Sequence, residues 1–247
     1  MTAVGKLVAV QARRTLREPA AAFFMVAFAP LFALLMGLVF GNEPQAEFGD
    51  RGYIDANLAS FPAIVLAIVS FVLVPIDIVS QRESGALRRF RATPLRPVGY
   101  IAADVLVRFA ISLLSIAAMF ALGMLVFGAR PAGDLASVLL AAVLGVLAFL
   151  AVGYALAAVM PSQGTAQAFG NVLVYPLIIL SGAAVPTAVL PEGVRQVAQF
   201  SPLTQLVELL RGLWAGQPWA ENWVPLVVLL GVLGAATAVA ARFFRWE

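Results

Sequence analysis

The chain has 247 residues, of which 62% are apolar and only 12% charged, and its formal net charge is +3. An ordinary soluble domain carries roughly 25% charged residues, so this composition excludes a water-soluble protein and indicates an integral membrane protein. The small net charge indicates membrane orientation and not nucleic-acid binding. Cysteine and histidine are both absent from the sequence, which excludes disulfides, cysteine-based metal sites and the commonest general base.

The first 18 residues are predicted to form an amphipathic helix that lies along the membrane surface. At about 100° per residue, Lys6, Arg13 and Arg17 fall within one narrow sector, with small and apolar side chains opposite. A basic sector of this kind faces lipid headgroups; the alternative is a solvated basic tail. No cleavable signal peptide is expected, because the apolar run that follows is too long for one.

Six segments are apolar and long enough to span a bilayer, for which a helix needs about 20 residues. They cover residues 19–42, 56–76, 105–129, 135–160, 166–190 and 222–241. The uncharged stretch at 135–191 is too long for one helix, and turn-forming residues at 161–165 divide it into two spans. Six spans place both termini on the same side.

A polar island at 81–97 carries five arginines between the second and third spans. A helix is predicted over 81–92, in which Glu83, Leu87 and Phe90 share one face at i, i+4 and i+7. Such a helix is suited to insert into a groove of a soluble partner. The alternative is a cationic loop that lies on anionic headgroups, and the residues leave both interpretations open.

Two short helices are predicted on the outer side, within 191–216, between the fifth and sixth spans. Pro202 stands at a helix start and Gly216 lies just past the end. Between them apolar side chains form one stripe, whereas Glu208 and Arg211 lie on other faces at i, i+3 spacing. We expect these helices to dip toward the outer leaflet and close the top of a pathway; the alternative is a surface loop lying flat on lipid.

The lysines and arginines indicate which side of the membrane is cytoplasmic. Most of them lie in 1–18, 77–108 and 242–247, which the six-span topology places together. By the positive-inside rule this side is the cytoplasm, and both termini are expected there. Trp214 and Trp223 are expected in an aromatic belt at the outer interface.

Ionisable side chains inside the spans would indicate an ion or proton path. The few near them are Asp77, Asp104 and Arg108, at the inner ends of the second and third spans, which argues against an ion-coupled transporter. A nucleotide-binding P-loop needs Gly-x-x-x-x-Gly-Lys-Ser/Thr, and the only lysine, Lys6, has no such loop before it. If transport is driven by ATP, we therefore expect ATP and magnesium to bind to a partner, and no cofactor in this chain.

Three parts of the chain together resemble one protein family. The motifs are Arg82-Glu83-x-Gly85-x-Leu87-x-x-Phe90-x-Ala92-Thr93-Pro94, the segment Arg13-Arg14-Thr15-Leu16-Arg17-Glu18-Pro19, and the C-terminal series Ser181-Gly182, Leu190-Pro191, Ser201-Pro202-Leu203-Thr204 and Leu210-Arg211-Gly212-Leu213. In order and spacing they resemble ABC-2 type transporter permeases, the membrane subunits of a class of ATP-binding-cassette exporters, including the drug-exporter permeases of the daunorubicin-resistance type.

The resemblance implies the ABC-2, or type V, exporter fold. That fold is an all-α integral membrane protein with six transmembrane helices in one domain, an N-terminal interfacial helix, a cytoplasmic coupling helix and re-entrant outer helices. In the family the loop helix docks into the nucleotide-binding subunit, so the implied coupling residues are Arg82, Glu83, Gly85, Leu87 and Phe90. The implied partners are two copies of an ATP-binding-cassette ATPase subunit, which hold ATP and magnesium, and a second permease chain that forms a homodimer.

The resemblance also implies where substrate passes. In the family, spans two and five line a cavity across the dimer axis, which suggests Phe71, Asn171 and Tyr175 as pathway residues. Ordinary helix packing is the alternative for each of them. The outer gate is assigned to Pro191, Pro202, Glu208 and Arg211.

The expected function is efflux, as in multidrug resistance, by a multi-pass permease subunit in a bacterial inner membrane. The cargo would be a hydrophobic or amphiphilic compound, drug or lipid-like, moved outward. One alternative is export of a lipid-linked polysaccharide by the same family, and another, outside transport, is a membrane scaffold. A membrane-embedded enzyme acting on lipid is disfavoured because histidine, cysteine and clustered acids within the spans are missing, so the chain is expected not to be catalytic by itself.

Overall fold

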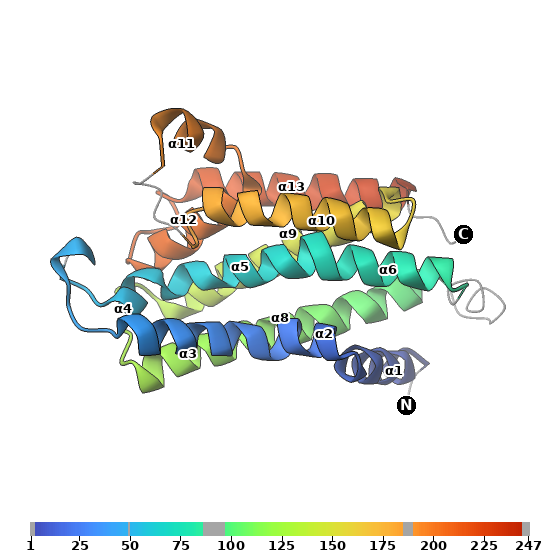
Figure 1. Cartoon of the computed structure of the whole chain (residues 1–247), viewed down its shortest axis with the longest axis horizontal. Coiled ribbons are helices and arrows are strands. Elements are labelled where there is room, and N and C mark those ends of the chain that lie inside the picture. The colour runs from blue at the N-terminus through green and yellow to red at the C-terminus, as the bar shows by residue number, and fades with distance from the viewer. Residues whose placement is uncertain (1–2, 49, 86–96, 185–189, 244–247) are drawn as a thin grey trace.

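The computed structural model describes residues 3–48, 50–85, 97–184 and 190–243, which form a bundle of helices with no strand among them (Figure 1). The helices are α1 (Ala3–Arg17), α2 (Pro19–Ala22), α3 (Phe28–Phe40), α4 (Tyr53–Asn57), α5 (Phe61–Ile68), α6 (Val74–Glu83), α8 (Pro97–Val126), α9 (Leu135–Val159), α10 (Gln163–Leu180), α11 (Glu192–Ala198), α12 (Pro202–Trp214) and α13 (Trp223–Phe243). Short π-helical turns, η1 (Phe23–Ala27) and η4 (Val69–Leu73), and 3₁₀ turns, η2 (Ala46–Phe48) and η3 (Leu58–Ser60), lie between them.

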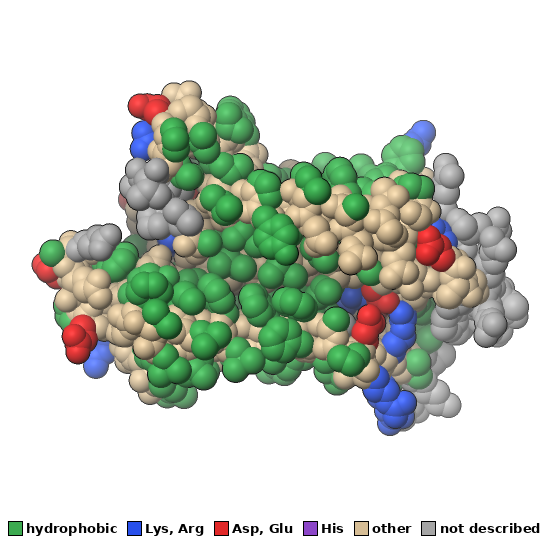
Figure 2. All heavy atoms as spheres, viewed as in Figure 1, with side chains coloured by type: hydrophobic (Ala, Val, Ile, Leu, Met, Phe, Trp, Pro, Cys, Tyr) green, Lys and Arg blue, Asp and Glu red, His purple; other side chains and the backbone are tan. Residues whose placement is uncertain are grey.

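Within the residues that the structure describes, five stretches of helix are long and apolar enough to cross a membrane. They are Phe23–Phe40, Tyr53–Glu83, Gly99–Val126, Leu135–Val159 and Trp223–Phe243, with mean hydropathies between 2.3 and 2.8. Figure 2 shows hydrophobic side chains over the middle of the visible face and charged side chains toward the two ends of the bundle. The chain is therefore an all-α membrane protein, as its composition predicts.

The predicted fifth span corresponds to α10, which runs alongside these helices and packs on α5, η4 and α6 (Figure 1). It is less apolar than the five because its first half carries Gln163, Gln167 and Asn171. The helix ends at Leu180, short of the predicted end at 190, because Gly182 takes a left-handed φ of 80° in a turn. The count of six spans stays a prediction.

The second and third spans differ from their predicted bounds. Helical structure continues from Tyr53 to Glu83, where 56–76 was expected, and α8 begins at Pro97, where 105 was expected. Charged side chains lie within both extensions. Asp77 and Asp104 can lie within helices there because arginines pair with them: Arg14 and Arg108 with Asp77, and Arg108 with Asp104.

The bundle packs around α9, which contacts α6, α8, α12 and α13. Small residues on α9 allow close approach. A Cβ atom added to Gly153 would lie 2.9 Å from the carbonyl oxygen of Ser70, and one added to Gly145 would lie 2.6 Å from Leu206. Such contacts stabilise helix pairs in lipid, where the hydrophobic effect between helices is absent.

Local capping signals define where α9 and α10 begin. The Asp134 carboxylate accepts hydrogen bonds from the backbone N–H groups of Ala136 and Ser137 at 3.2 and 3.1 Å, and these bonds lower the pKa of Asp134. Ser162 accepts a hydrogen bond from the N–H of Thr165 at 3.2 Å. The predicted turn between the two helices lies at this second cap.

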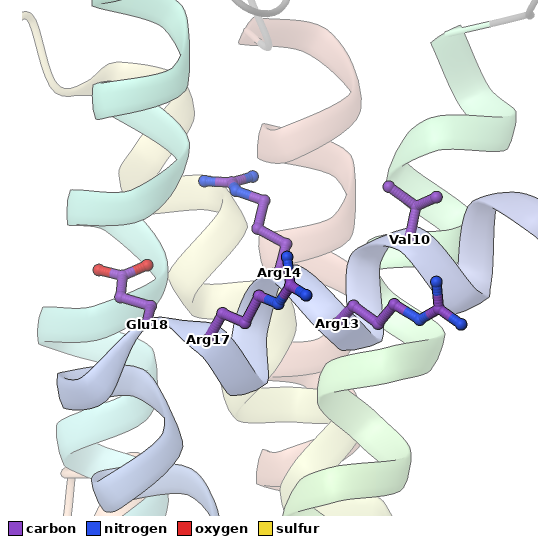
Figure 3. Close-up of a pocket in the computed structure, with 5 residues that line it drawn as sticks. All are labelled: Val10, Arg13, Arg14, Arg17 and Glu18. Carbon is purple, nitrogen blue, oxygen red and sulfur yellow. The ribbon is translucent and has the colours of Figure 1, made fainter.

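At one end of the bundle α1 runs across the long helices instead of along them, as Figure 3 shows. It packs on α8 and α2. Gln11 and Thr15 are buried on its inner face, whereas Val10, Arg13 and Arg17 are exposed. The predicted helix is therefore present, with Arg13 and Arg17 exposed; its place at the membrane surface stays a prediction.

At the opposite end, α11 and α12 form the two predicted outer helices (Figure 1). Whereas α11 is mostly exposed, α12 packs on α5, α9 and α13. Its buried apolar stripe comprises Leu203, Leu206, Val207, Leu209, Leu210, Leu213 and Trp214. A helix packed in this way is not a surface loop that lies flat on lipid.

Trp214 corrects one expectation about the outer interface. Its side chain is only 3% exposed, so it does not belong to a lipid-facing aromatic belt. The indole N–H donates to the carbonyl oxygen of Asp55 at 2.9 Å, and the ring stacks on Phe120 with centroids 5.6 Å apart. Trp223 is 62% exposed and remains a candidate for such a belt.

Candidate coupling and transport sites

Charged side chains from three helices and a tyrosine from a fourth meet at the end of the bundle next to α1. Arg108 on α8 donates through Nε to Asp104 Oδ2 at 2.9 Å and through Nη2 to Asp77 on α6. Arg14 on α1 donates to the other oxygen of Asp77 at 2.5 Å. Tyr154 on α9 donates its hydroxyl to Asp104. One network therefore ties α1, α6, α8 and α9 together; we call it the inner ion network.

Burial makes this network sensitive to the loss of any member. Arg108 and Asp104 are each only 1% exposed, and a buried charge is tolerated only when it is paired and hydrogen-bonded. The two arginines, Arg14 and Arg108, balance the two aspartates, Asp77 and Asp104. The network is neutral as a whole, which is why it can sit against apolar spans.

Sequence reasoning identified three of these residues only as evidence against ion coupling. It missed that Arg14 and Tyr154 complete a network with them. The spacing of Asp104 and Arg108, four residues apart in an otherwise uncharged stretch, was the available signal of a pair. The long-range partners had no comparable signal.

Arg82 and Glu83 form a second junction at the same end of the bundle. The Arg82 guanidinium donates to the carbonyl oxygens of Ala157 and Pro161, each at 3.4 Å, and to that of Met160, where α9 ends. The Glu83 carboxylate accepts a hydrogen bond from the N–H of Gln163 at 3.0 Å, where α10 begins. A cation at a helix C-terminus and an anion at a helix N-terminus both complement the helix dipoles.

The structure corrects the start of the predicted coupling helix over 81–92. Residues up to Glu83 belong to α6, and Gly85 then takes a left-handed φ of 69°, which ends the helix. Glu83 therefore does not continue one helix to Leu87 and Phe90, and it faces the α9–α10 turn. Leu87 and Phe90 themselves lie outside the described residues.

The predicted pathway residues lie on neighbouring helices. Phe71 is in η4, with its ring edge-on to Phe149 at a centroid distance of 6.3 Å. On α10, Gly170 approaches the backbone at Phe71 so closely that an added Cβ atom would lie 3.1 Å from its carbonyl carbon. Asn171 is half-buried, whereas Tyr175 is 64% exposed. The helix that carries Asn171 and Tyr175 thus packs on Phe71 through Gly170, and Tyr175 faces outward.

Arg211 is the best-anchored of the predicted outer-gate residues. Its Nη2 donates to Asn57 Oδ1 at 3.1 Å, to Ser60 Oγ at 3.2 Å and to the carbonyl oxygen of Gly182 at 2.9 Å. It thereby joins α12 to the start of the second span and to the turn after α10. Within the described residues it forms no ion pair with Glu208, which is exposed.

The other two gate residues have roles at helix starts. Pro191 is the residue that precedes α11, and Pro202 is the first residue of α12. Arg211 also borders a cavity of about 370 Å³ at this end of the bundle, lined by Phe48, Arg51, Asp55, Ala56, Arg211, Trp214 and Ala215.

A family model described as ABC-2 type transporter matches residues 2–214, which is most of the chain. The chain belongs to the ABC-2 type transporter family. This agrees with the resemblance seen in its motifs and with the helical membrane fold. The match includes α1, the Arg82–Glu83 junction and α12, so the sites described above fall within the family region.

The relatives of this ABC-2 chain include a nodulation protein and a transport permease of bacteria. Nodulation protein J of Rhizobium leguminosarum bv. viciae is 34% identical over 83 residues, which is 34% of this chain and 32% of that protein. The inner membrane transport permease YhhJ, from Escherichia coli K12 and from Shigella flexneri, is 24% identical over 216 residues, which is 83% of this chain and 57% of that protein. This chain thus spans about a third to just over half the length of these relatives.

Proposed function

We propose that this ABC-2 chain is the membrane subunit of an exporter in a bacterial inner membrane, and that it moves a hydrophobic or amphiphilic compound outward. ATP hydrolysis in a separate ATP-binding-cassette subunit drives the movement. Family membership supports the transport role, and the name of the Escherichia coli relative, an inner membrane transport permease, supports the location. The lack of a P-loop in the sequence supports assigning ATP and magnesium to a partner.

The junction made by Arg82 and Glu83 is the observation that carries this proposal. It lies where the second span leaves the bundle and enters the polar island, and it fastens α6 to both α9 and α10. A partner that displaces the polar island would therefore move three helices together. In this scheme Leu87 and Phe90 dock into the ATPase, and Glu83 transmits the displacement.

The proposed complex has two copies of this chain and two ATPase subunits. Phe71 of η4 packs against Gly170 of α10, which precedes Asn171 in the sequence, and Tyr175 on the same helix is exposed. A second copy placed against this face would enclose a pathway between the two chains, with Arg211 and the gate helices at its outer end. The apolar lining suits an amphiphilic cargo better than an ion or a free sugar.

The decisive experiment uses the chain co-expressed with its ATP-binding subunit and reconstituted in proteoliposomes. Glu83→Gln removes the charge at the start of α10 while it keeps the size of the side chain. We expect stimulated ATP hydrolysis and export of an amphiphilic dye to fall roughly two- to fivefold, since a charge at a helix terminus contributes about 0.3–1 kcal/mol. The matched control Glu192→Gln, an exposed carboxylate on α11, should leave both rates unchanged.

Three results would contradict parts of the proposal. If Glu83→Gln leaves the rates of both ATP hydrolysis and export at the level of the control, the junction does not transmit the displacement from the ATPase. Failure of the chain to co-purify with any ATP-binding subunit would contradict the proposal that such a subunit is its partner. If a lipid-linked sugar stimulates ATP hydrolysis and amphiphilic compounds do not, the cargo is a lipid-linked polysaccharide and not an amphiphilic compound.

A further inference from the structure

A cavity of about 500 Å³ lies along the exposed side of α1. Its lining consists of Val10, Arg13, Arg14, Arg17 and Glu18, so three guanidinium groups and one carboxylate surround it (Figure 3). The inner ion network accounts for Arg14, but neither it nor the Arg82–Glu83 junction accounts for Arg13 and Arg17.

The three arginines have different partners. Arg14 is committed to the protein, because it pairs with Asp77 at 2.5 Å and reaches the hydroxyl of Tyr100 at 3.5 Å. Arg13 and Arg17 are exposed, and within the described residues neither has a hydrogen-bonded or ion-paired partner. They are four residues apart and therefore lie on one face of α1. Two guanidinium groups on this face are thus available to a ligand.

Glu18 does not neutralise these two groups. Figure 3 shows its carboxylate pointing away from Arg13 and Arg17, beyond the end of α1. The site therefore presents two adjacent cations to a ligand and one carboxylate at its margin. Two cations on one helix face attract the negative charge of a phosphate group.

The surroundings of the cavity indicate which phosphate would bind. Val10 and Leu16 are 59% and 52% exposed beside the arginines, and Phe23 is 45% exposed just after the turn into the first span. The helix that carries the site lies at one end of the bundle and runs across the long helices (Figures 1 and 3). A ligand here meets cations on one side and apolar side chains on the other, as a phospholipid does at the boundary between headgroups and acyl chains.

We propose that Arg13 and Arg17 form a binding site for the phosphodiester group of a membrane phospholipid, with Val10 and Leu16 against its glycerol and acyl region. Because Arg14 on the same helix holds Asp77 of the second span, the bound lipid fixes α1 against the inner ion network. The site sets the depth of α1 in the inner leaflet. It does not depend on which compound the protein transports.

The test titrates the purified, delipidated full chain with phosphatidylglycerol, with phosphatidylcholine and with inorganic phosphate, and counts bound lipid by native mass spectrometry. The variant Arg13→Gln/Arg17→Gln should bind phosphatidylglycerol about thirtyfold more weakly, since each cation near an anionic headgroup contributes about 1 kcal/mol. The control Arg195→Gln/Arg242→Gln removes two exposed arginines elsewhere and should bind as the wild type does. Arg13→Lys/Arg17→Lys keeps both charges and should retain most of the affinity.

Three outcomes would overturn the proposal. Equal binding by the Gln variant and the control would show that the arginines of α1 do not hold the lipid. A lysine variant that binds as weakly as the Gln variant, with unchanged helical content, would show that charge is not the basis of recognition. Displacement of phosphatidylglycerol by equimolar inorganic phosphate would assign the site to a soluble anion. Binding of phosphatidylcholine alongside phosphatidylglycerol would support a site for the phosphodiester itself.

Discussion

Replacing Arg108 with glutamine would leave the buried Asp104 and the partly buried Asp77 facing one remaining arginine. Arg108 is 1% exposed and bonds to both Asp104 and Asp77. Removal of one partner from a buried ion pair costs about 3–5 kcal/mol, because the other charge stays desolvated and unpaired. For a chain of this size, 1 kcal/mol shifts the melting temperature by about 2–4 °C. We therefore expect Arg108→Gln to lower the melting temperature by about 6–20 °C.

The assay is thermal unfolding of the purified protein in detergent, followed by the loss of the monodisperse species on size exclusion. The informative comparison is the double variant Asp104→Asn/Arg108→Gln. It restores charge balance, because Asp77 keeps Arg14, and asparagine can still accept the hydrogen bond from Tyr154. The double variant should therefore regain most of the melting temperature that the single variant loses.

Two results would refute this reasoning. One is a double variant that is no more stable than Arg108→Gln alone, which would mean that uncompensated charge is not the cause of the loss. The other is a single variant that matches the control Arg242→Gln, in which an exposed arginine on α13 is neutralised. Surface substitutions of that kind usually change stability by about 0.5 kcal/mol or less.

Two other substitutions test the packing of the bundle. Gly170→Ala places a methyl group against the backbone at Phe71 and should lower the free energy of unfolding by about 1–3 kcal/mol through overpacking. In the control Gly164→Ala, on the same helix, the methyl group enters open space and should not lower the melting temperature. Arg211→Met removes the three hydrogen bonds that join α12 to its neighbours. The backbone amides of α12 should therefore exchange hydrogen faster in this variant than in the control Arg195→Met. Equal exchange rates in both variants would mean that Arg211 does not hold α12 in place.

Local composition predicted much of the helical order. The fourth predicted span, 135–160, agrees with α9 at Leu135–Val159, and α12 begins at the predicted Pro202. Both have a sequence signal at the boundary itself, a capping side chain or a proline, together with a long apolar or amphipathic run. Such signals act over a few residues, so they can be recognised without knowledge of the fold.

The predicted bounds of the spans differ from those of the observed helices where charged residues lie inside a helix. Asp77 and Asp104 made the ends of the second and third spans appear polar, although the helices continue past them because Arg14 and Arg108 neutralise both carboxylates. Arg14 is separated from Asp77 by 63 positions. No local pattern indicates a pair at that separation.

The polar island shows the same limit at a candidate site. The face predicted from Glu83, Leu87 and Phe90 assumed one continuous helix, but Gly85 at a φ of 69° interrupts it. Glu83 then meets the N–H of Gln163, 80 positions away. A glycine can occupy a helix interior or end a helix, and only the surrounding structure selects between the two.

The sequence by itself determined the class of protein, the places where the long apolar helices break and the amphipathic character of α1 and α12, because hydropathy, capping and turn chemistry act locally. The tertiary structure alone decided which charges pair, which helices Arg82 and Glu83 join, and which apolar faces are packed against other helices. The physical reason is that a membrane span is apolar on all sides. Its periodicity therefore cannot distinguish a face that meets lipid from one that meets protein.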